Sequence, residues 1–304
     1  MGLYRLTGVA AQCPSALFPQ RNPYSVSTGG SSGPIFGAIS LLAMLTYLVA
    51  TALLGRRLMR AAQGVAVAKP RTLLPGAAAA LLHGIVSYHS LFGHGVLNLG
   101  FFNSLSLVAW IMVVLMLIAA LGRPVESVGI LLYPLAAVTV TLDGLFRAPQ
   151  VLGHVGWGLD AHIVISLLAY SVLSVASLQA ILLAVQHHHL RNKHPGGLVR
   201  ALPPLQIMET LLFQMIAVGF VLLSLALITG LFFLHDIFNQ HLVHKTVLSV
   251  IAWVVFAVLL WGRWRFGWRG PVAIRWTLGG IFSLMLAYFG TKFVLDLILH
   301  QVAG

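Results

Sequence analysis

Long apolar stretches recur along this chain, and short connections rich in Lys and Arg separate them. A helix rises about 1.5 Å per residue, so about 20 mainly apolar residues are needed to cross a hydrocarbon layer of about 30 Å. Stretches of suitable length and apolarity occupy residues 34–54, 73–92, 101–121, 127–145, 157–186, 205–234, 244–261 and 274–299. The sequence therefore predicts an all-α, polytopic membrane bundle of about eight transmembrane helices.

Composition excludes the alternative of a water-soluble helical domain. The chain is 59% hydrophobic and only 8% charged, whereas soluble domains carry roughly 25% charged residues. Two of the eight stretches are weaker than the others, because Gly76 and His83 interrupt the second and Pro134 and Asp143 interrupt the fourth.

The distribution of positive charge predicts how the bundle sits in the membrane. Short cytoplasmic loops retain Lys and Arg, and the first, third, fifth and seventh connections hold most of these residues. We therefore expect both termini on the outer side, in the periplasm. The net charge of +12 is explained by this topology and by contact with anionic lipid headgroups, so the lipid bilayer is the expected partner and nucleic acid is not.

The chain divides into an extension and a membrane domain. Residues 1–33 are rich in Ser, Gly and Pro, and we expect a disordered N-terminal extension. Residues 34–304 form the membrane domain, with four helices over 34–145 and the remaining helices over 157–299. Cys13 is the only cysteine, which excludes an internal disulfide, and the chain has six carboxylate residues and no hydrolase motif. We expect no enzymatic activity.

Polar residues within the later stretches follow helical spacing. His162, Ser166, Tyr170 and Ser174 are separated by intervals of four, so they share one helical face with histidine outermost. A histidine is also outermost in the last stretch, where the spaced residues are Tyr288, Lys292, Asp296 and His300. A third set begins beside His244 and consists of Lys245, Ser249 and Trp253. All three sets approach the same predicted outer surface.

These patterns allow two interpretations. Hydroxyl residues in membrane helices commonly bond to backbone carbonyls, so the sets could serve helix packing alone. Several histidines converging without nearby arginines could instead bind heme iron, zinc or copper, and spacing does not choose among these metals.

Four segments carry a resemblance to a known family. They are HIVISLLAYSVLSVASLQAILLA (162–184), METLLFQMIAVGFVLLSLALITGLFF (208–233), HKTVLSVIAWVVFAVLLWGRWRFGWRG (244–270) and AYFGTKFVLDLIL (287–299). They resemble the YpjD/CorE-type inner-membrane branch of the cytochrome c assembly (CcsA/CcmC-like) family. The resemblance implies a bacterial inner membrane, heme handling at the outer face, and His162 as an external axial ligand. His300 would be the second ligand, and His244 competes with it on geometry.

The chain departs from the heme-handling relatives in one segment. Those relatives carry a Trp-rich motif, WGxxWxWD, before the seventh span, whereas residues 235–246 here read HDIFNQHLVHKT without any Trp. We therefore expect an accessory protein that binds or handles heme without cytochrome c synthase activity, with heme-handling or cytochrome assembly proteins as partners. The alternatives are a protein affecting divalent-cation handling, with Asp236, Asp296 and the outer histidines as ligands, and a membrane scaffold without heme.

Overall fold

The computed structural model describes residues 33–65, 70–92, 97–98, 100–146, 151–152, 157–192, 196, 198–233 and 240–290. The extension expected over residues 1–33 lies outside this part except for Gly33, which begins α1. The α-helices are α1 (Gly33–Ala62), α2 (Pro70–Phe92), α3 (Phe101–Gly122), α4 (Gly129–Leu145), α5 (Trp157–Arg191), α6 (Leu198–Ala201), α7 (Leu205–Phe233), α8 (Gln240–Phe266) and α9 (Pro271–Met285). A 3-10 turn η1 (Glu126–Val128) precedes α4, a π-helix η2 (Leu286–Gly290) follows α9, and β1 (Leu97–Asn98) pairs antiparallel with β2 (Val151–Leu152).

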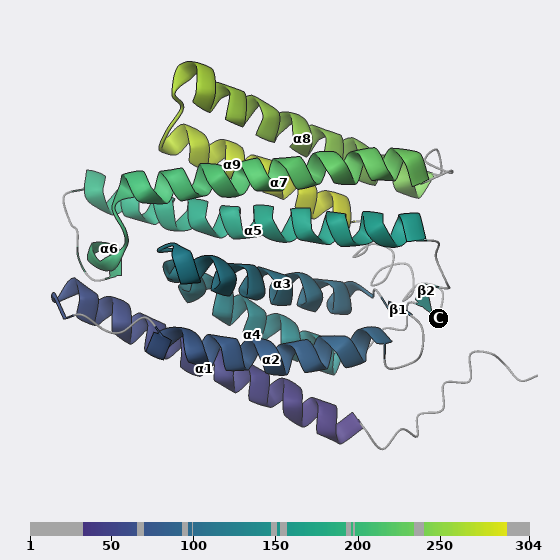
Figure 1. Cartoon of the computed structure of the whole chain (residues 1–304), viewed down its shortest axis with the longest axis horizontal. Helices are drawn as coiled ribbons and strands as arrows, with labels where there is room; N and C mark the ends of the chain where they lie inside the picture. The colour runs from purple at the N-terminus through teal and green to yellow at the C-terminus, as the bar shows by residue number, and fades with distance from the viewer. Residues whose placement is uncertain are drawn as a thin grey trace, which may run out of the picture.

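The long helices lie side by side along their lengths, with their connections gathered at two ends (Figure 1). Helices α1 to α4 form one half of the bundle, and α5, α7, α8 and α9 form the other. Contacts between α3 and α5 join the halves. This arrangement confirms the predicted all-α polytopic bundle. The sequence did not predict the small β1–β2 pair.

Seven helical segments of the described chain, rather than the expected eight, are long and apolar enough to cross a membrane. The segment that falls short is α2, where Pro75, His83 and His89 dilute the apolar run. Its 23 residues extend over about 35 Å, and the helix packs lengthwise against α1 and α3 (Figure 1). Helix α2 therefore has the length of a span but carries its polar groups into contact with neighbouring helices.

The polar residue at the centre of α2 joins three helices. His83 is 0% exposed, and its Nδ1 lies 3.1 Å from the Tyr47 hydroxyl of α1 while its Nε2 lies 2.9 Å from the Ser106 hydroxyl of α3. Buried polar groups cost free energy unless they are hydrogen-bonded. Both ring nitrogens of His83 are satisfied, so this histidine serves the packing of the first half rather than ligand binding.

Close packing between α5 and α7 organises the second half. A Cβ built on Gly219 of α7 would lie 2.5 Å from Leu173 Cδ2 of α5, and Leu173 is fully buried. Small residues allow such a close approach of membrane helices. The same helix pair continues toward the start of α5, where it positions His162.

The two ends of the bundle differ chemically. At one end, here called the basic end, α1, α3, α5 and α8 terminate (Figure 1). The described arginines belong to these helix ends or to the segments that follow them. At the other, here called the histidine end, α5 begins with His162 in its second turn and α7 terminates. The start of α1 and the π-helix η2 both lie at the histidine end, so the two ends of the described membrane domain share one side.

Candidate functional site

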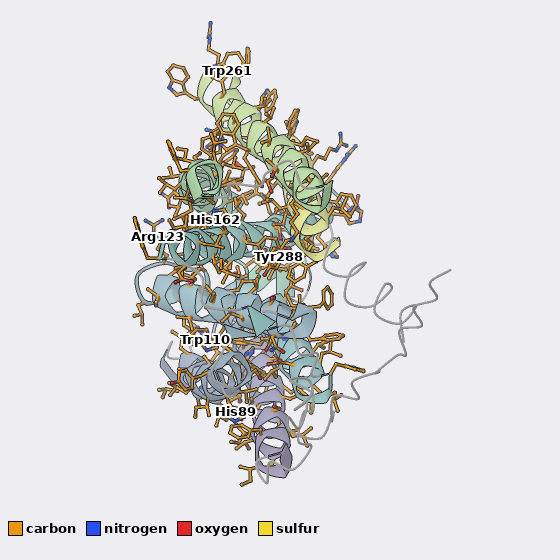
Figure 2. All side chains as sticks on the ribbon, turned by 90° about the vertical axis from the view of Figure 1, so that its right-hand side faces the viewer. His89, Trp110, Arg123, His162, Trp261 and Tyr288 are labelled. Atoms are coloured by element: carbon orange, nitrogen blue, oxygen red, sulfur yellow. The ribbon has the colours of Figure 1, made fainter. Side chains whose placement is uncertain are left out.

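The polar set predicted on α5 lies on a single continuous helix. Helix α5 extends from Trp157 to Arg191, and His162 and Ser166 are half-buried near its start, while Tyr170 and Ser174 are buried deeper in the bundle. Figure 2, viewed onto the histidine end, shows His162 in the half built from the later helices and His89 in the N-terminal half.

The His162 imidazole is oriented by α7. Its Nδ1 lies 3.1 Å from the Thr229 hydroxyl oxygen. That hydroxyl lies 2.8 Å from the carbonyl oxygen of Leu225 and 3.1 Å from that of Ala226, so its own proton has an acceptor within α7 and its oxygen is free to accept from the ring. Hydrogen-bond partners decide which ring nitrogen carries the proton. These contacts favour the tautomer of His162 with its proton on Nδ1.

This assignment leaves a lone pair on the second ring nitrogen. Nε2 of His162 has the Ser166 hydroxyl at 3.5 Å, the outer limit of a hydrogen bond. Histidines that bind metals commonly donate one N–H to an oxygen that fixes the ring, while the other nitrogen binds the metal. Thr229, Leu225 and Ser166 thus give His162 the geometry of a ligand with an orienting partner.

Tyr170 of the α5 set contacts Tyr288, the described member of the last set, at a position deeper in the bundle than His162. The Tyr170 ring lies 5.9 Å from that of Tyr288 and 5.4 Å from that of Phe289, between ring centroids. Both partners belong to η2, and π-helical turns are frequent at functional sites. The aromatic cluster continues to Phe101 of α3, whose ring lies 5.7 Å from that of Phe289.

Two hydroxyls of α5 beside this cluster have no hydrogen-bond partner among the residues that the structure describes. Tyr170 is 8% exposed and Ser174 5% exposed, and the side-chain oxygens of both are buried without a partner. Burying such a group costs free energy unless water or a ligand compensates. The expected polar face of α5 therefore reaches the bundle interior with part of its hydrogen-bonding capacity unused.

The set on α8 contacts α7 instead of α5. Trp253 donates its indole N–H to the Ser224 hydroxyl at 2.8 Å and stacks on Phe220 with ring centroids 5.4 Å apart. Lys245, one residue after His244, is half-buried at the start of this helix. Helix α7 thus lies between the sets of α5 and α8, and supplies a hydroxyl to each.

Several expected site residues lie outside the described part of the chain. These are Lys292, Asp296, His300, Asp236 and the side chain of His244, whose backbone belongs to the first turns of α8. The second heme ligand and the ligands of the cation alternative consequently remain predictions. Among the described residues, no group of three or more His, Cys, Asp or Glu side chains could hold a metal ion.

Sequence reasoning did not identify Thr229 or Ser224 as partners. They are five residues apart, so they give no interval-of-four pattern on α7. One feature of the sequence could have identified Thr229. It lies near the end of the stretch 205–234, so if that helix and the one beginning near residue 157 are antiparallel, Thr229 and His162 lie at the same membrane depth.

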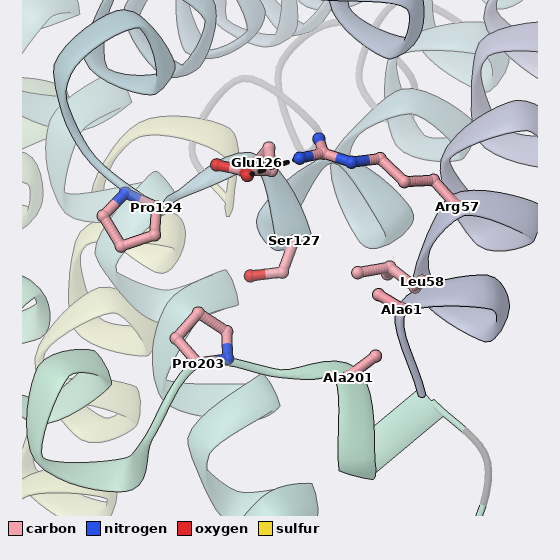
Figure 3. Close-up of a pocket in the computed structure, with 8 residues that line it drawn as sticks. All are labelled: Arg57, Leu58, Ala61, Pro124, Glu126, Ser127, Ala201 and Pro203. Carbon is pink, nitrogen blue, oxygen red and sulfur yellow. Dashed lines mark ion pairs between the residues drawn. The ribbon is translucent and has the colours of Figure 1, made fainter. Parts of the chain in front are cut away.

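A small pocket lies at the opposite, basic end (Figure 3). It has a volume of about 90 Å³ and lies between α1, η1 and the segment preceding α7. The Arg57 guanidinium forms an ion pair with Glu126 at 3.4 Å on its rim. Typical ligand pockets measure about 300–1,000 Å³, so this pocket suits a few waters rather than a heme.

Comparisons with known proteins find one family model and several similar proteins. Residues 72–299 match the family described as Cytochrome C assembly protein. Inner membrane protein YpjD of Escherichia coli K12 is 32% identical over 269 residues, covering 87% of this chain and 99% of the relative. An uncharacterized 28.8 kDa protein of Azospirillum brasilense is 34% identical over 65% of this chain and 77% of its own length.

A cytochrome c biogenesis protein CcsA is also similar to part of the chain. The CcsA of Guillardia theta is 24% identical over 191 residues, which cover 57% of this chain and 64% of the relative. No solved structure matches.

Proposed function

Because this chain belongs to the cytochrome c assembly protein family, we propose that it binds heme, or passes heme on, near the histidine end of its bundle. It is a multi-pass inner membrane protein: its E. coli relative is named as one, and the described part of the chain has seven apolar helices of spanning length. Family members handle heme, and the part of this chain that matches the family, residues 72–299, includes α5 and α7.

The orientation of His162 is the observation that supports this proposal. Its Nδ1 donates to Thr229 and its Nε2 keeps a lone pair. A bound heme would supply an iron that accepts this lone pair. His162 would hold the iron, and Thr229 would keep the ring in the required orientation. The second axial ligand would be His300 or His244.

We further propose an accessory role without cytochrome c synthase activity. Residues 235–246, which lead into and begin α8, contain no Trp, whereas the heme-handling relatives carry their Trp-rich motif before the corresponding helix. This segment therefore lacks the Trp residues expected for presenting heme to an apocytochrome. Heme-handling or cytochrome assembly proteins would receive heme from it or deliver heme to it.

Visible absorption spectroscopy tests the heme assignment. Full-length protein purified in mild detergent from heme-replete cells is expected to contain heme and to give a bis-His spectrum in the oxidised and reduced states. His162→Ala should lose most of this heme. His89→Ala is the matched control, because His89 lies at the same end but stacks on Phe36 with ring centroids 3.5 Å apart.

The outcomes separate the assignments clearly. A colourless wild-type protein, or equal heme content in His162→Ala and wild type, would overturn the proposal. His244→Ala and His300→Ala distinguish the second ligand, since only the variant that removes it should convert the spectrum to a five-coordinate form.

A further inference from the structure

The turn between α8 and α9 presents exposed aromatic and cationic side chains together. Trp261, Trp264 and Phe266 are 58%, 83% and 63% exposed. Arg265 and Arg269 are exposed beside them, and Arg275 is exposed in the first turns of α9. Trp261 lies at the outer edge of the later half in Figure 2, far from His89 and separated from His162.

The carboxylates of the described residues form no ion pair with these arginines. Of its six acidic residues, the described ones at the basic end are Glu126, paired with Arg57, and Glu209, whose Oε1 accepts the backbone N–H of Gly270 at 2.8 Å. Arg265, Arg269 and Arg275 form no ion pair with any described residue. Their charge is therefore available to a partner outside the chain.

Contacts to α7 and two glycines with positive φ angles shape this turn. Gly267 and Gly270 adopt φ angles of 66° and 52°, which favour glycine. The Arg263 guanidinium donates to the Trp268 carbonyl oxygen at 3.2 Å and lies 4.7 Å from the Phe213 ring centroid. With Glu209 bound to Gly270, both flanks of the turn are anchored to α7.

We propose that this turn, residues 261–275, is a binding site for anionic phospholipid headgroups. Guanidinium groups pair with phosphate oxygens in bidentate fashion, and Trp rings favour the headgroup layer of a membrane. Val254 of α8 and Phe282 of α9 are also exposed, on the two helices that the turn connects, and acyl chains would lie along these helices. The ligand is a membrane phosphodiester with attached acyl chains rather than free phosphate.

Native mass spectrometry of the full-length protein tests this site. The probes are phosphatidylglycerol and phosphatidylcholine with identical acyl chains, added to detergent-purified protein. The wild-type protein should retain more phosphatidylglycerol than phosphatidylcholine. A basic residue near an anionic surface contributes about fivefold in affinity, so Arg265→Gln/Arg269→Gln should bind phosphatidylglycerol about thirtyfold more weakly. Inorganic phosphate should not compete.

Two further variants keep the test specific. Arg56→Gln/Arg60→Gln removes the same charge from exposed positions at the same end, on α1 at the far side of the bundle, and should bind phosphatidylglycerol like wild type. Arg265→Lys/Arg269→Lys keeps the charge and should retain most binding. Equal losses in both Gln variants, no loss in either, competition by inorganic phosphate, or equal retention of both lipids would overturn the proposal.

Discussion

At the scale of single residues, one hydroxyl decides how the candidate ligand is presented. Thr229 accepts from His162 Nδ1 at 3.1 Å while donating to a backbone carbonyl. Valine has the shape of threonine but cannot accept this hydrogen bond. We expect Thr229→Val to weaken heme binding about 10- to 100-fold, as losses of orienting partners do in other metal sites. Heme titration of the apoprotein, followed by absorbance, measures this effect.

Thr229→Ser is the matched control for that substitution. Serine keeps the hydroxyl and its backbone hydrogen bond, so its heme affinity should stay close to that of wild type. An unchanged affinity in Thr229→Val would show that the ring of His162 does not depend on α7, and would contradict the assigned orientation.

The same residues show what the sequence could predict about the site. The interval of four placed His162, Ser166 and Tyr170 on one face of a helix, and α5 has that face. It could not identify Thr229, because that contact depends on the axial register between two antiparallel helices. Nor could it show that the hydroxyl of Tyr170 is buried without a partner in the described part of the chain. Both facts belong to tertiary packing, which periodicity within one helix does not encode.

At the scale of elements, the contact between α5 and α7 supports the site. A Cβ on Gly219 would lie 2.5 Å from Leu173 Cδ2 and 2.6 Å from its Cγ. Leu173 is fully buried and has little room to shift. We expect Gly219→Ala to destabilise the protein by about 1–3 kcal/mol through overpacking, observed as a lower Tm in detergent and reduced heme retention.

Two comparisons make this expectation specific. A Cβ on Gly279 of α9 would meet nothing within 4 Å, so Gly279→Ala should be neutral or stabilising. Leu173→Ala removes the atoms that an alanine at Gly219 would meet, so adding Gly219→Ala to it should cost less than in wild type. If Gly219→Ala leaves the Tm unchanged, α5 and α7 are not held at this distance.

Helix boundaries were predictable wherever the apolar run and the helix coincide. The stretches 101–121 and 205–234 correspond closely to α3 (Phe101–Gly122) and α7 (Leu205–Phe233). The stretch 244–261 is shorter than α8 (Gln240–Phe266), because helical hydrogen bonding continues through polar residues that hydropathy assigns to the connection. The π-helix η2 was not predicted, since the extra residue in its turn leaves no trace in apolar spacing.

At the scale of the whole molecule, the two halves use polar residues differently. In the first half, His83 is enclosed and both its nitrogens have partners from α1 and α3. In the second half, His162 is half-buried near an end of the bundle and keeps one nitrogen available. The first half thus has the features of a support, and the second combines an oriented ligand at one end with the basic aromatic turn at the other.

The orientation of the bundle in the membrane, which decides whether the basic end or the histidine end faces the cytoplasm, remains a prediction. Arginine retention in cytoplasmic connections places the basic end inside and the termini outside. Cys13 is the only cysteine and precedes α1, which begins at the histidine end; residue 13 itself lies outside the described part. We expect a membrane-impermeant maleimide to label Cys13 in intact cells.

A second variant tests the basic end. In a Cys13→Ser background, Gln63→Cys lies at an exposed position of that end and should react only after lysis. Labelling of Gln63→Cys but not of Cys13 in intact cells would reverse the orientation, moving the proposed heme site to the cytoplasmic face and the lipid site to the outer leaflet.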